Sequence, residues 1–266
     1  MFLSTPAKYI KLSALMIKIN ILSAMTYKVS FVMQIIGMII GDTSFAIMWA
    51  IFFKRFPMIN GWQSNDMMVL MALSSINFGL CSFFAGGIWD LAKKITSAEL
   101  DQHITAPQNT LWSIATSKSF VHGLGEIFFG ISLYILFGNL SFFSILQFTI
   151  LTLATAIILF NFQVITQSIS FFVGNFEDAA DQFYVALAFC TYTPQGSFTG
   201  FFKIIMFTII PGFFVAELPI KIIKTFNVYY FLLLLAFTAI TCFLAIFTFK
   251  QGLKRYESGN LMNVKM

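Results

Sequence analysis

Charged side chains are scarce in this chain. Only 10% of its 266 residues are Asp, Glu, Lys or Arg, whereas 58% are hydrophobic and the mean hydropathy is +0.84. Ordinary soluble domains carry about 25% charged residues, so the composition excludes a soluble protein and predicts an integral membrane protein. A chain of this length holds about six helical spans of roughly 20 residues each, which leaves no room for a soluble catalytic domain.

The residues that build common catalytic and metal sites are also few. The three cysteines lie inside apolar stretches without the spacing of a disulfide framework or metal site, and the two histidines stand alone. Neither a Gly-x-x-x-x-Gly-Lys-Ser/Thr phosphate loop nor a Gly-x-Ser-x-Gly nucleophile turn occurs. We therefore expect no enzymatic activity, cofactor or metal on this chain, and an energy source supplied by a partner or an ion gradient.

The apolar runs predict an all-α membrane protein with six transmembrane helices in one domain, residues 1–266. The predicted spans cover residues 29–53, 67–88, 120–137, 142–173, 200–216 and 226–249. The fourth is longer than a bilayer requires, so it is expected to tilt, protrude or bend.

The region of the fifth span has two interpretations. The favoured one places an interfacial helix before the Pro194–Gly196 break and a span over 200–216, with Pro211-Gly212 kinking or breaking that span. The alternative is a span that ends at the first break and is followed by a re-entrant segment, because irregular backbone is tolerated where protein buries it.

Residues 6–25 precede the first span and are mixed rather than uniformly apolar. Lys11 and Lys18 are seven positions apart and share one helical face with the nearby Lys8, opposite an apolar face. This pattern predicts an amphipathic helix lying in the membrane surface. The alternative is a polar lead-in to the first span.

Most of the 16 basic residues belong to the two termini and to residues 89–119, the longest hydrophilic interval. An even number of spans places both termini on one side, and cytoplasmic segments carry the excess of Lys and Arg. Both termini and residues 89–119 are therefore predicted to be cytoplasmic. Since the basic residues sit beside the ends of apolar runs, they indicate membrane orientation and not a nucleic-acid partner.

The hydrophilic interval contains features of a short helix. Ser97 is expected to cap a helix whose first turn carries Glu99 and Asp101, and Pro107 is expected to end it. The alternative is a solvated loop with incidental capping residues. A surface of this kind is where a membrane-embedded protein meets a soluble partner.

Three local patterns resemble one known family. They are ELDQHITAP at residues 99–107, PGFFVAELP at 211–219 and GLKRYESG at 252–259. These runs are similar to the loop, paired-proline and C-terminal patterns of ATP-binding-cassette (ABC) exporter type-2 membrane permeases, particularly a six-span bacterial branch. One departure is Ala106, where a basic residue often precedes the proline, and this puts a specific charge contact with the partner in doubt.

This resemblance implies a permease subunit in the bacterial cytoplasmic membrane. It would form a homodimer or a heterodimer with a related permease and work with a separate ATPase chain, which would bind ATP and Mg²⁺. The coupling loop, residues 89–119, would rest on that ATPase. Its docking residues would be Ser97, Glu99, Leu100, Asp101, His103, Thr105 and Pro107.

Several polar residues lie within the predicted spans, where ionisable groups are costly and usually functional. The candidate lining of a translocation path comprises Asp42, His122, Glu126, Asn161 and Gln163. His122 and Glu126 are four positions apart on one helical face and are candidates for a pair. The alternative for the amides is hydrogen bonding between helices. Asp42 and Glu126 also support an alternative function, an ion- or proton-coupled secondary transporter, although no inverted repeat accompanies them.

Overall fold

The computed structural model describes residues 6–194 and 200–256. The regular elements in this part are helices, apart from one isolated bridge between Ile59 and Trp62, so the predicted all-α class is confirmed. Four helical stretches are long and apolar enough to cross a membrane. They are Tyr9–Arg55, Ser64–Thr96, Phe142–Val173 and Val228–Arg255. His122–Phe137 is also apolar but shorter, and together these helices make a multi-pass membrane protein.

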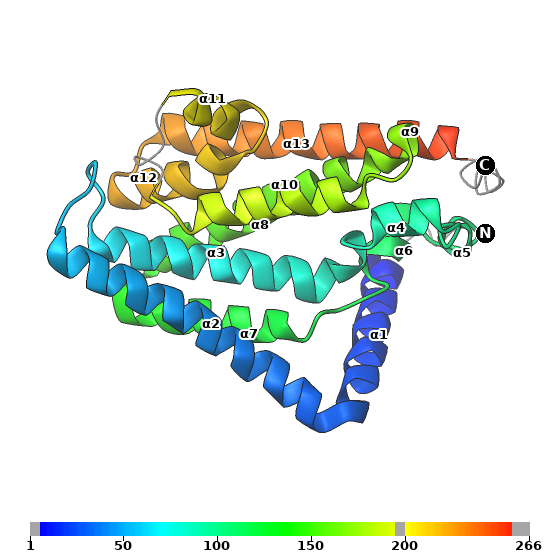
Figure 1. The fold of residues 1–266 in the computed structure, drawn as a ribbon, viewed down its shortest axis with the longest axis horizontal. Coiled ribbons are helices and arrows are strands. Elements are labelled where there is room, and N and C mark those ends of the chain that lie inside the picture. Colours follow the sequence, from blue (N-terminus) through cyan, green and yellow to red (C-terminus); the bar gives the residue numbers. More distant parts are fainter. Residues whose placement is uncertain (1–5, 195–199, 257–266) are drawn as a thin grey trace.

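The longer helices lie roughly along one axis of the molecule (Figure 1). They are α2 (Lys28–Arg55), α3 (Ser64–Ala85), α7 (His122–Phe137), α8 (Phe142–Ser168), α10 (Glu177–Thr191) and α13 (Val228–Arg255). Helix α3 packs against α2, α7, α8 and α10. Its residues from Met67 to Ser75 are all buried, as expected for a helix that is apolar on every side. The core of the fold is therefore built around α3.

Helices α3 and α7 approach closely because glycines lie at their contact. A Cβ on Gly130 would come within 2.6 Å of the Ala72 carbonyl oxygen, and one on Gly79 within 2.6 Å of the Gly123 carbonyl oxygen. Without a hydrophobic effect between helices in lipid, such close backbone packing is a main source of association. The glycines of α7 thus fix its position beside α3.

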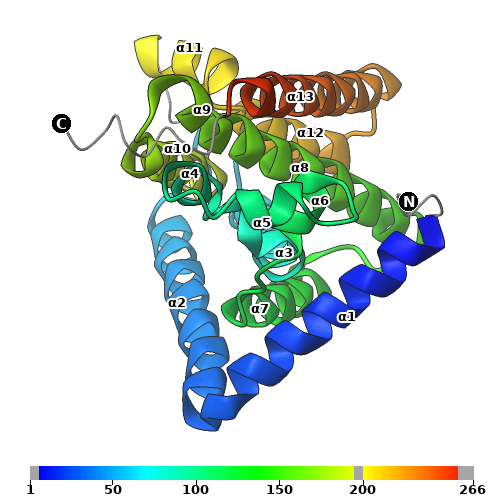
Figure 2. The same cartoon turned by 90° about the vertical axis from the view of Figure 1, so that its right-hand side faces the viewer.

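Helix α1 and the three short helices of the coupling loop lie together at one end of the molecule (Figure 2). Helix α1 (Pro6–Ala24) crosses this end and turns through a short 3₁₀ segment, Met25–Tyr27, into α2. The coupling loop lies at the same end, after a 3₁₀ turn at Gly86–Ile88. Its helices are α4 (Leu91–Thr96), α5 (Asp101–Ile104) and α6 (Thr110–Ala115).

The predicted fourth span, residues 142–173, is interrupted near its end. Helix α8 stops at Ser168 and a separate turn of helix, α9 (Ser170–Val173), follows. Gly174 then adopts φ of 87°, a left-handed conformation that favours glycine, and reverses the chain into α10. The bend lies at the end of the molecule that carries the coupling loop (Figure 1).

Residues 200–216 do not form one continuous helix. Helix α11 (Gly200–Thr208) ends before Pro211, and a π-helical turn, Phe213–Glu217, leads into α12 (Leu218–Lys224). Pro211 has no N–H to donate and its ring excludes the preceding helical turn, whereas Pro219 lies in the first turn of α12, where proline is tolerated. The break expected at Pro211-Gly212 is therefore present. Of the other predicted break, Gln195 and Gly196 lie outside the described residues.

Candidate functional site

The coupling loop has a compact internal structure of three short helices. Helix α4 ends at Thr96, and the Ser97 N–H donates to the Lys93 carbonyl oxygen at 2.8 Å. Ala98 then takes φ of 61°, a conformation that stops a helix. The chain re-enters helix for a single turn, α5, and reaches α6 after the Asn109 side chain accepts a hydrogen bond from the Trp112 N–H.

The predicted capping role of Ser97 is wrong. Ser97 closes the C-terminus of α4 and makes no side-chain cap to α5, whose preceding residue is Leu100. The helix of the loop starts earlier than its polar residues suggested, because Leu91 and Ala92 are buried and extend the helical path of α3 into the loop. Asp101 does lie in the first turn of α5, where a carboxylate is favoured.

Leu100 does not face solvent, although the sequence suggested that it contacts a partner. Its side chain is 0% exposed and belongs to a buried cluster with Ile88 and Ile114 of the loop region and with residues of two long helices. Those residues are Val164 of α8 and Ala245 and Phe249 of α13. Leu100 therefore belongs to the buried cluster that joins the coupling loop to the long helices.

The outer surface of the loop is formed by other residues. Ser97, Glu99, Thr105 and Pro107 are exposed and Asp101 is partly exposed. Gln102 and Ile104 are exposed as well, and Ile104 has 41% of its surface accessible. These two residues were missed by sequence reasoning. Leu100 and His103 are three positions apart and buried, whereas Gln102 and Ile104 lie between and beyond them and are exposed. This helical spacing, which is visible in the sequence, could have indicated that Gln102 and Ile104 face outward.

His103 is buried as well, at 8% exposure. Its Nδ1 lies 2.9 Å from the Ser113 hydroxyl of α6, while its Nε2 has no hydrogen-bond partner among the described residues. Burial lowers the pKa of His103 below its ordinary value, the positive charge of Lys94 lowers it further, and Glu99 opposes the shift. The imidazole is thus held in its neutral form inside the loop.

Helix α1 is joined to the coupling loop by hydrogen bonds. The Trp112 indole N–H donates to the Ser13 hydroxyl at 2.8 Å, and the Asn20 amide donates to the Ser119 hydroxyl at 3.1 Å. Tyr9 accepts from the Asn109 N–H at 3.3 Å. The contacting residues of α1, Tyr9, Ser13 and Asn20, are four and seven positions apart and form a polar stripe on the face opposite the lysines. This stripe was not identified from the sequence.

The two ends of the loop are tied to each other and to α8. The Lys118 ammonium donates to Asp90 Oδ2 at 2.7 Å, which joins the beginning of the loop to its end. The Ala92 N–H donates to Gln167 Oε1 of α8 at 3.0 Å and so satisfies a free donor in the first turn of α4. A displacement of the loop must therefore be accompanied by movement of α8 or by breakage of these bonds.

The C-terminal pattern, residues 252–259, contributes to the same end of the molecule. Gly252 allows α13 to lie against Phe171 of α9, because a Cβ there would overlap the Phe171 ring. Leu253 and Tyr256 pack against the cluster that contains Leu100. Glu257, Ser258 and Gly259 of the pattern lie outside the described residues.

The two acids within the long helices face the same side of α3. Ser75 donates to Asp42 Oδ2 of α2 at 3.2 Å, and Ser82 donates to Glu126 Oε2 of α7 at 3.3 Å. Both acids are 4% exposed. Since the two serines are seven positions apart on one helix, they present both carboxyl groups to one face. Each carboxyl group thus receives a hydrogen bond inside the fold.

The remaining polar candidates do not join these acids. Within the described residues His122 forms no ion pair with Glu126, and its ring packs near Phe120, with centroids 5.3 Å apart. Asn161 donates to the Thr241 hydroxyl at 3.2 Å and so connects α8 to α13. Gln163 is buried with neither amide atom paired in the described part of the chain. The described structure therefore brings Asp42 and Glu126 to one side of α3 but does not join His122, Asn161 or Gln163 to them.

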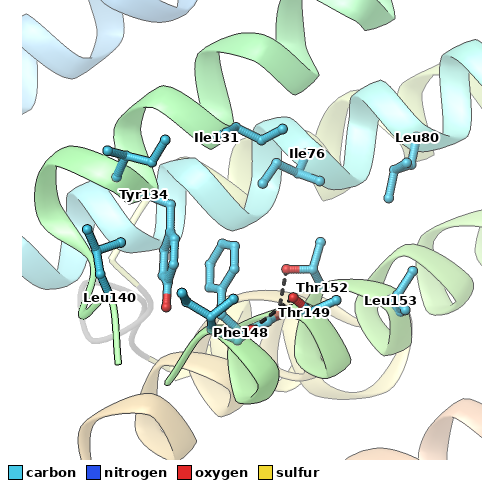
Figure 3. Close-up of a pocket in the computed structure, with 11 residues that line it drawn as sticks. Ile76, Leu80, Ile131, Tyr134, Leu140, Phe148, Thr149, Thr152 and Leu153 are labelled. Atoms are coloured by element: carbon cyan, nitrogen blue, oxygen red, sulfur yellow. Dashed lines mark hydrogen bonds between the residues drawn. The ribbon is translucent and has the colours of Figure 1, made fainter. Parts of the chain in front are cut away.

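An apolar crevice lies elsewhere, between α3, α7 and α8 (Figure 3). It has a volume of about 330 Å³ and neither acid lines it. Tyr134 and Phe148 stack in it with ring centroids 3.7 Å apart, and the Thr152 hydroxyl turns back to the Phe148 carbonyl oxygen. Because its hydroxyl groups are bonded to the helix backbone, the crevice presents an apolar surface.

Comparison with protein families identifies the family of this chain. A family model described as "ABC-2 family transporter protein" covers residues 39–259, which is most of the chain. The matched region includes five of the six long helices completely and the greater part of α2, together with the whole coupling loop. Searches among curated proteins and among solved structures found no match.

Proposed function

As a member of the ABC-2 transporter family, the chain is a membrane permease subunit of an ABC transporter, and we propose that this transporter is an exporter. Its energy would come from ATP and Mg²⁺ bound by a separate ATPase chain, since this sequence has no phosphate loop. The site of contact with that ATPase would be the exposed face of the coupling loop. The membrane would be the bacterial cytoplasmic membrane, with both termini on the cytoplasmic side.

The observation that carries this proposal is the dual packing of the coupling loop. One side buries Leu100 in a cluster with residues of α8 and α13, while the other side exposes Gln102, Ile104 and Thr105. A loop built in this way can transmit motion, because a displacement of its outer face moves a side chain in a buried cluster that also contains residues of two long helices. ATP-driven closure of the ATPase would thus tilt α8 and α13 and open the path outward.

We assign six crossings to α2, α3, α7, α8, α10 and α13. We propose α10 in place of residues 200–216 because it lies along the same axis as α8 (Figure 1); with 15 residues and two acids in its first turn, it would be the shortest of the crossings. Helices α11 and α12 lie together at the end opposite the coupling loop, as expected of a re-entrant segment. Lys224 of α12 forms an ion pair with Asp66 of α3 at 2.7 Å, which supports a structural role for this segment. Six crossings leave both termini on the coupling-loop side.

The proposed docking surface is tested by placing a charge on it. We expect Ile104→Asp to release the ATPase on purification in mild detergent, because a carboxylate would be desolvated in the contact. The bundle should remain folded, since Ile104 is 41% exposed. The measurement is mass spectrometry of the co-purified proteins together with the ATP hydrolysis rate of the preparation.

A matched control is Met58→Asp, which also introduces an aspartate in place of an apolar side chain. Met58 is 59% exposed and lies in the connection between α2 and α3, which is at the end opposite the coupling loop (Figure 1). This variant should retain both the ATPase chain and its activity. Retention of the ATPase and of ATP-coupled transport in Ile104→Asp would overturn the assignment of the docking surface. Loss of the ATPase in both variants would show that the effect is not specific to this end.

The dimer proposed for the permease would use α2. This helix turns most of its surface outward, and a Cβ on Gly37 or Gly41 would have no atom within 4 Å apart from its chain neighbours and the nearby backbone of α2 itself. Two small residues four positions apart allow another helix to approach closely. The partner would be a second copy of this chain or a related permease.

The alternative of an ion-coupled carrier has less support. It would use Asp42 and Glu126 as ion-binding groups, yet each accepts a hydrogen bond from a serine of α3. The family membership also favours a transporter driven by an ATPase chain. We therefore interpret the two acids as groups that join α2 and α7 to α3.

A further inference from the structure

A hollow of about 650 Å³ lies between α1 and the coupling loop. Its volume is within the range of about 300–1,000 Å³ that is typical of ligand sites. The residues that matter for its chemistry are Leu12 and Met16 of α1, Lys94 of α4, His103 of α5, Gln108 and Lys118. We call it the α1 hollow.

The α1 hollow contains a buried lysine that shares its acidic partner. Lys94 is 7% exposed, and its ammonium lies 3.8 Å from Asp90 Oδ2. The same oxygen is only 2.7 Å from Lys118. Asp90 thus pairs more closely with Lys118, although Glu99 adds a second negative charge that acts on Lys94. A bound anion would give Lys94 a closer partner than Asp90 provides.

Two further buried polar groups at the hollow have no partner. His103 Nε2 and Gln108 Oε1 make no hydrogen bond within the described residues, although His103 and Gln108 are only 8% and 6% exposed. Most buried polar atoms in proteins are paired. In the neutral tautomer that carries its proton on Nε2, His103 can donate a hydrogen bond to a phosphate oxygen. Lys94 and Lys118 can donate to the same phosphate.

The opposite wall of the hollow is apolar. It is formed by Leu12 and Met16, on the face of α1 that lies toward the coupling loop. The other side of α1 exposes Leu15, Ile19 and Leu22 together with Lys11 and Lys18. Such a mixture suits a helix at a membrane surface, where lysine side chains reach the head groups. A ligand held here would have its charged part at the lysines and its apolar part along α1.

We propose that the α1 hollow binds the phosphate of an anionic membrane phospholipid, whose acyl chains follow the apolar side of α1 into the bilayer. Basic pockets at the cytoplasmic side of membrane helices commonly hold such head groups. The bound lipid would link α1 to the coupling loop, in addition to their direct hydrogen bonds. This site does not depend on the docking of the ATPase, so the two proposals are tested separately.

The test uses the full-length protein with its native partners, delipidated in detergent and titrated with dioleoyl phosphatidylglycerol. Binding is measured by native mass spectrometry and by the shift in unfolding temperature. Parallel titrations with dioleoyl phosphatidylcholine and with inorganic phosphate distinguish an anionic lipid from a neutral lipid and from free phosphate. We expect the phosphatidylglycerol to bind most tightly and to raise the unfolding temperature most.

Two variants change the hollow in different ways. Lys118→Met removes one charge but keeps the length of the side chain, and it should weaken phosphatidylglycerol binding about fivefold. Ala106→Leu fills part of the hollow without any change of charge and should weaken binding comparably. The control, Lys93→Met, removes an exposed charge from the neighbouring position of α4 outside the hollow, and its binding should equal that of the unmodified protein.

Three results would overturn the proposal. The first is equal weakening in Lys118→Met and Lys93→Met, which would indicate attraction to surface charge in general. The second is unchanged binding in both Lys118→Met and Ala106→Leu. The third is a full shift with inorganic phosphate alone, which would identify free phosphate and not a lipid as the ligand.

Discussion

Leu100 and Ile104 show how two apolar residues in one turn of helix take different roles. Leu100 is buried in a cluster that includes residues of α8 and α13, whereas Ile104 lies on the surface of the coupling loop. A double change of Leu100 and Asp101 would therefore not test docking alone, because it would also remove a side chain from this buried cluster. Residue-level experiments on this loop have to separate buried from exposed positions.

We predict that Leu100→Ala destabilises the coupling loop. Truncation of a fully buried leucine costs about 2–5 kcal/mol, and the loss should appear as faster hydrogen exchange of α4–α6 amides. Ile104→Ala is the matched control and should change exchange little, because surface substitutions usually cost within about 0.5 kcal/mol. Equal exchange rates in the two variants would contradict the buried role of Leu100.

A second residue-level prediction concerns His103 and pH. Its pKa is lowered in the folded loop, first by burial and then by Lys94, so the unfolded chain takes up a proton more readily. Stability is therefore retained above the ordinary histidine pKa of 6.5 and decreases as the pH falls through it. The unfolding temperature of His103→Gln should fall less than that of the unmodified protein between about pH 7.5 and pH 5.5. Identical pH profiles would refute this prediction.

At the scale of elements, the close contact of α3 and α7 depends on the absence of side chains. Gly79 and Gly130 face backbone carbonyl groups of the opposite helix at distances that leave no space for a methyl group. Gly37 of α2 has open space around it. Glycine thus allows close packing of two helices at the α3–α7 contact, whereas on α2 it lies on a surface that no other part of the described chain covers.

We predict that Gly130→Ala separates α3 from α7 and lowers the unfolding temperature, because overpacking a tight contact costs about 1–3 kcal/mol. The Ala72 carbonyl oxygen, 2.6 Å from the new methyl group, cannot yield without movement of α3. Gly37→Ala is the control and should leave the temperature unchanged or slightly raised. A tolerated Gly130→Ala would show that the two helices are not packed this closely.

At the scale of the whole molecule, the coupling-loop end and the opposite end differ in construction. The first gathers α1, the coupling loop and the last turn of α13, and the second holds α11, α12 and the Asp66–Lys224 ion pair. This difference between the two ends agrees with the proposal that the ATPase chain binds the permease on one side of the membrane only.

The proposed dimer face predicts that Gly41→Leu prevents association of two permease chains. A leucine there would hold the partner helix away from the backbone of α2. Ala239→Leu, which places the same leucine side chain at an exposed position of α13, should leave the dimer intact. Multi-angle light scattering of the detergent-solubilised protein measures the difference, and a dimer that survives Gly41→Leu would exclude this face.

The sequence by itself determined the membrane class, the helical fold, the polar loop between the second and third spans, and the break at Pro211-Gly212. Each of these depends on local quantities, namely the apolar content of a run and the backbone limits of proline and glycine. The three motifs also pointed to the correct family.

Only the tertiary structure decided which way the side chains of short elements face. Leu100 turns inward because Val164, Ala245 and Phe249 pack in the same cluster, and these residues are distant from it in the chain. The positions of Asp42 and Glu126 also depend on tertiary packing. Asp42 of α2 and Glu126 of α7 meet the same face of α3, at Ser75 and Ser82, because α2 and α7 both pack against that helix. A local pattern cannot report such contacts, since they arise from the packing of distant helices against one another.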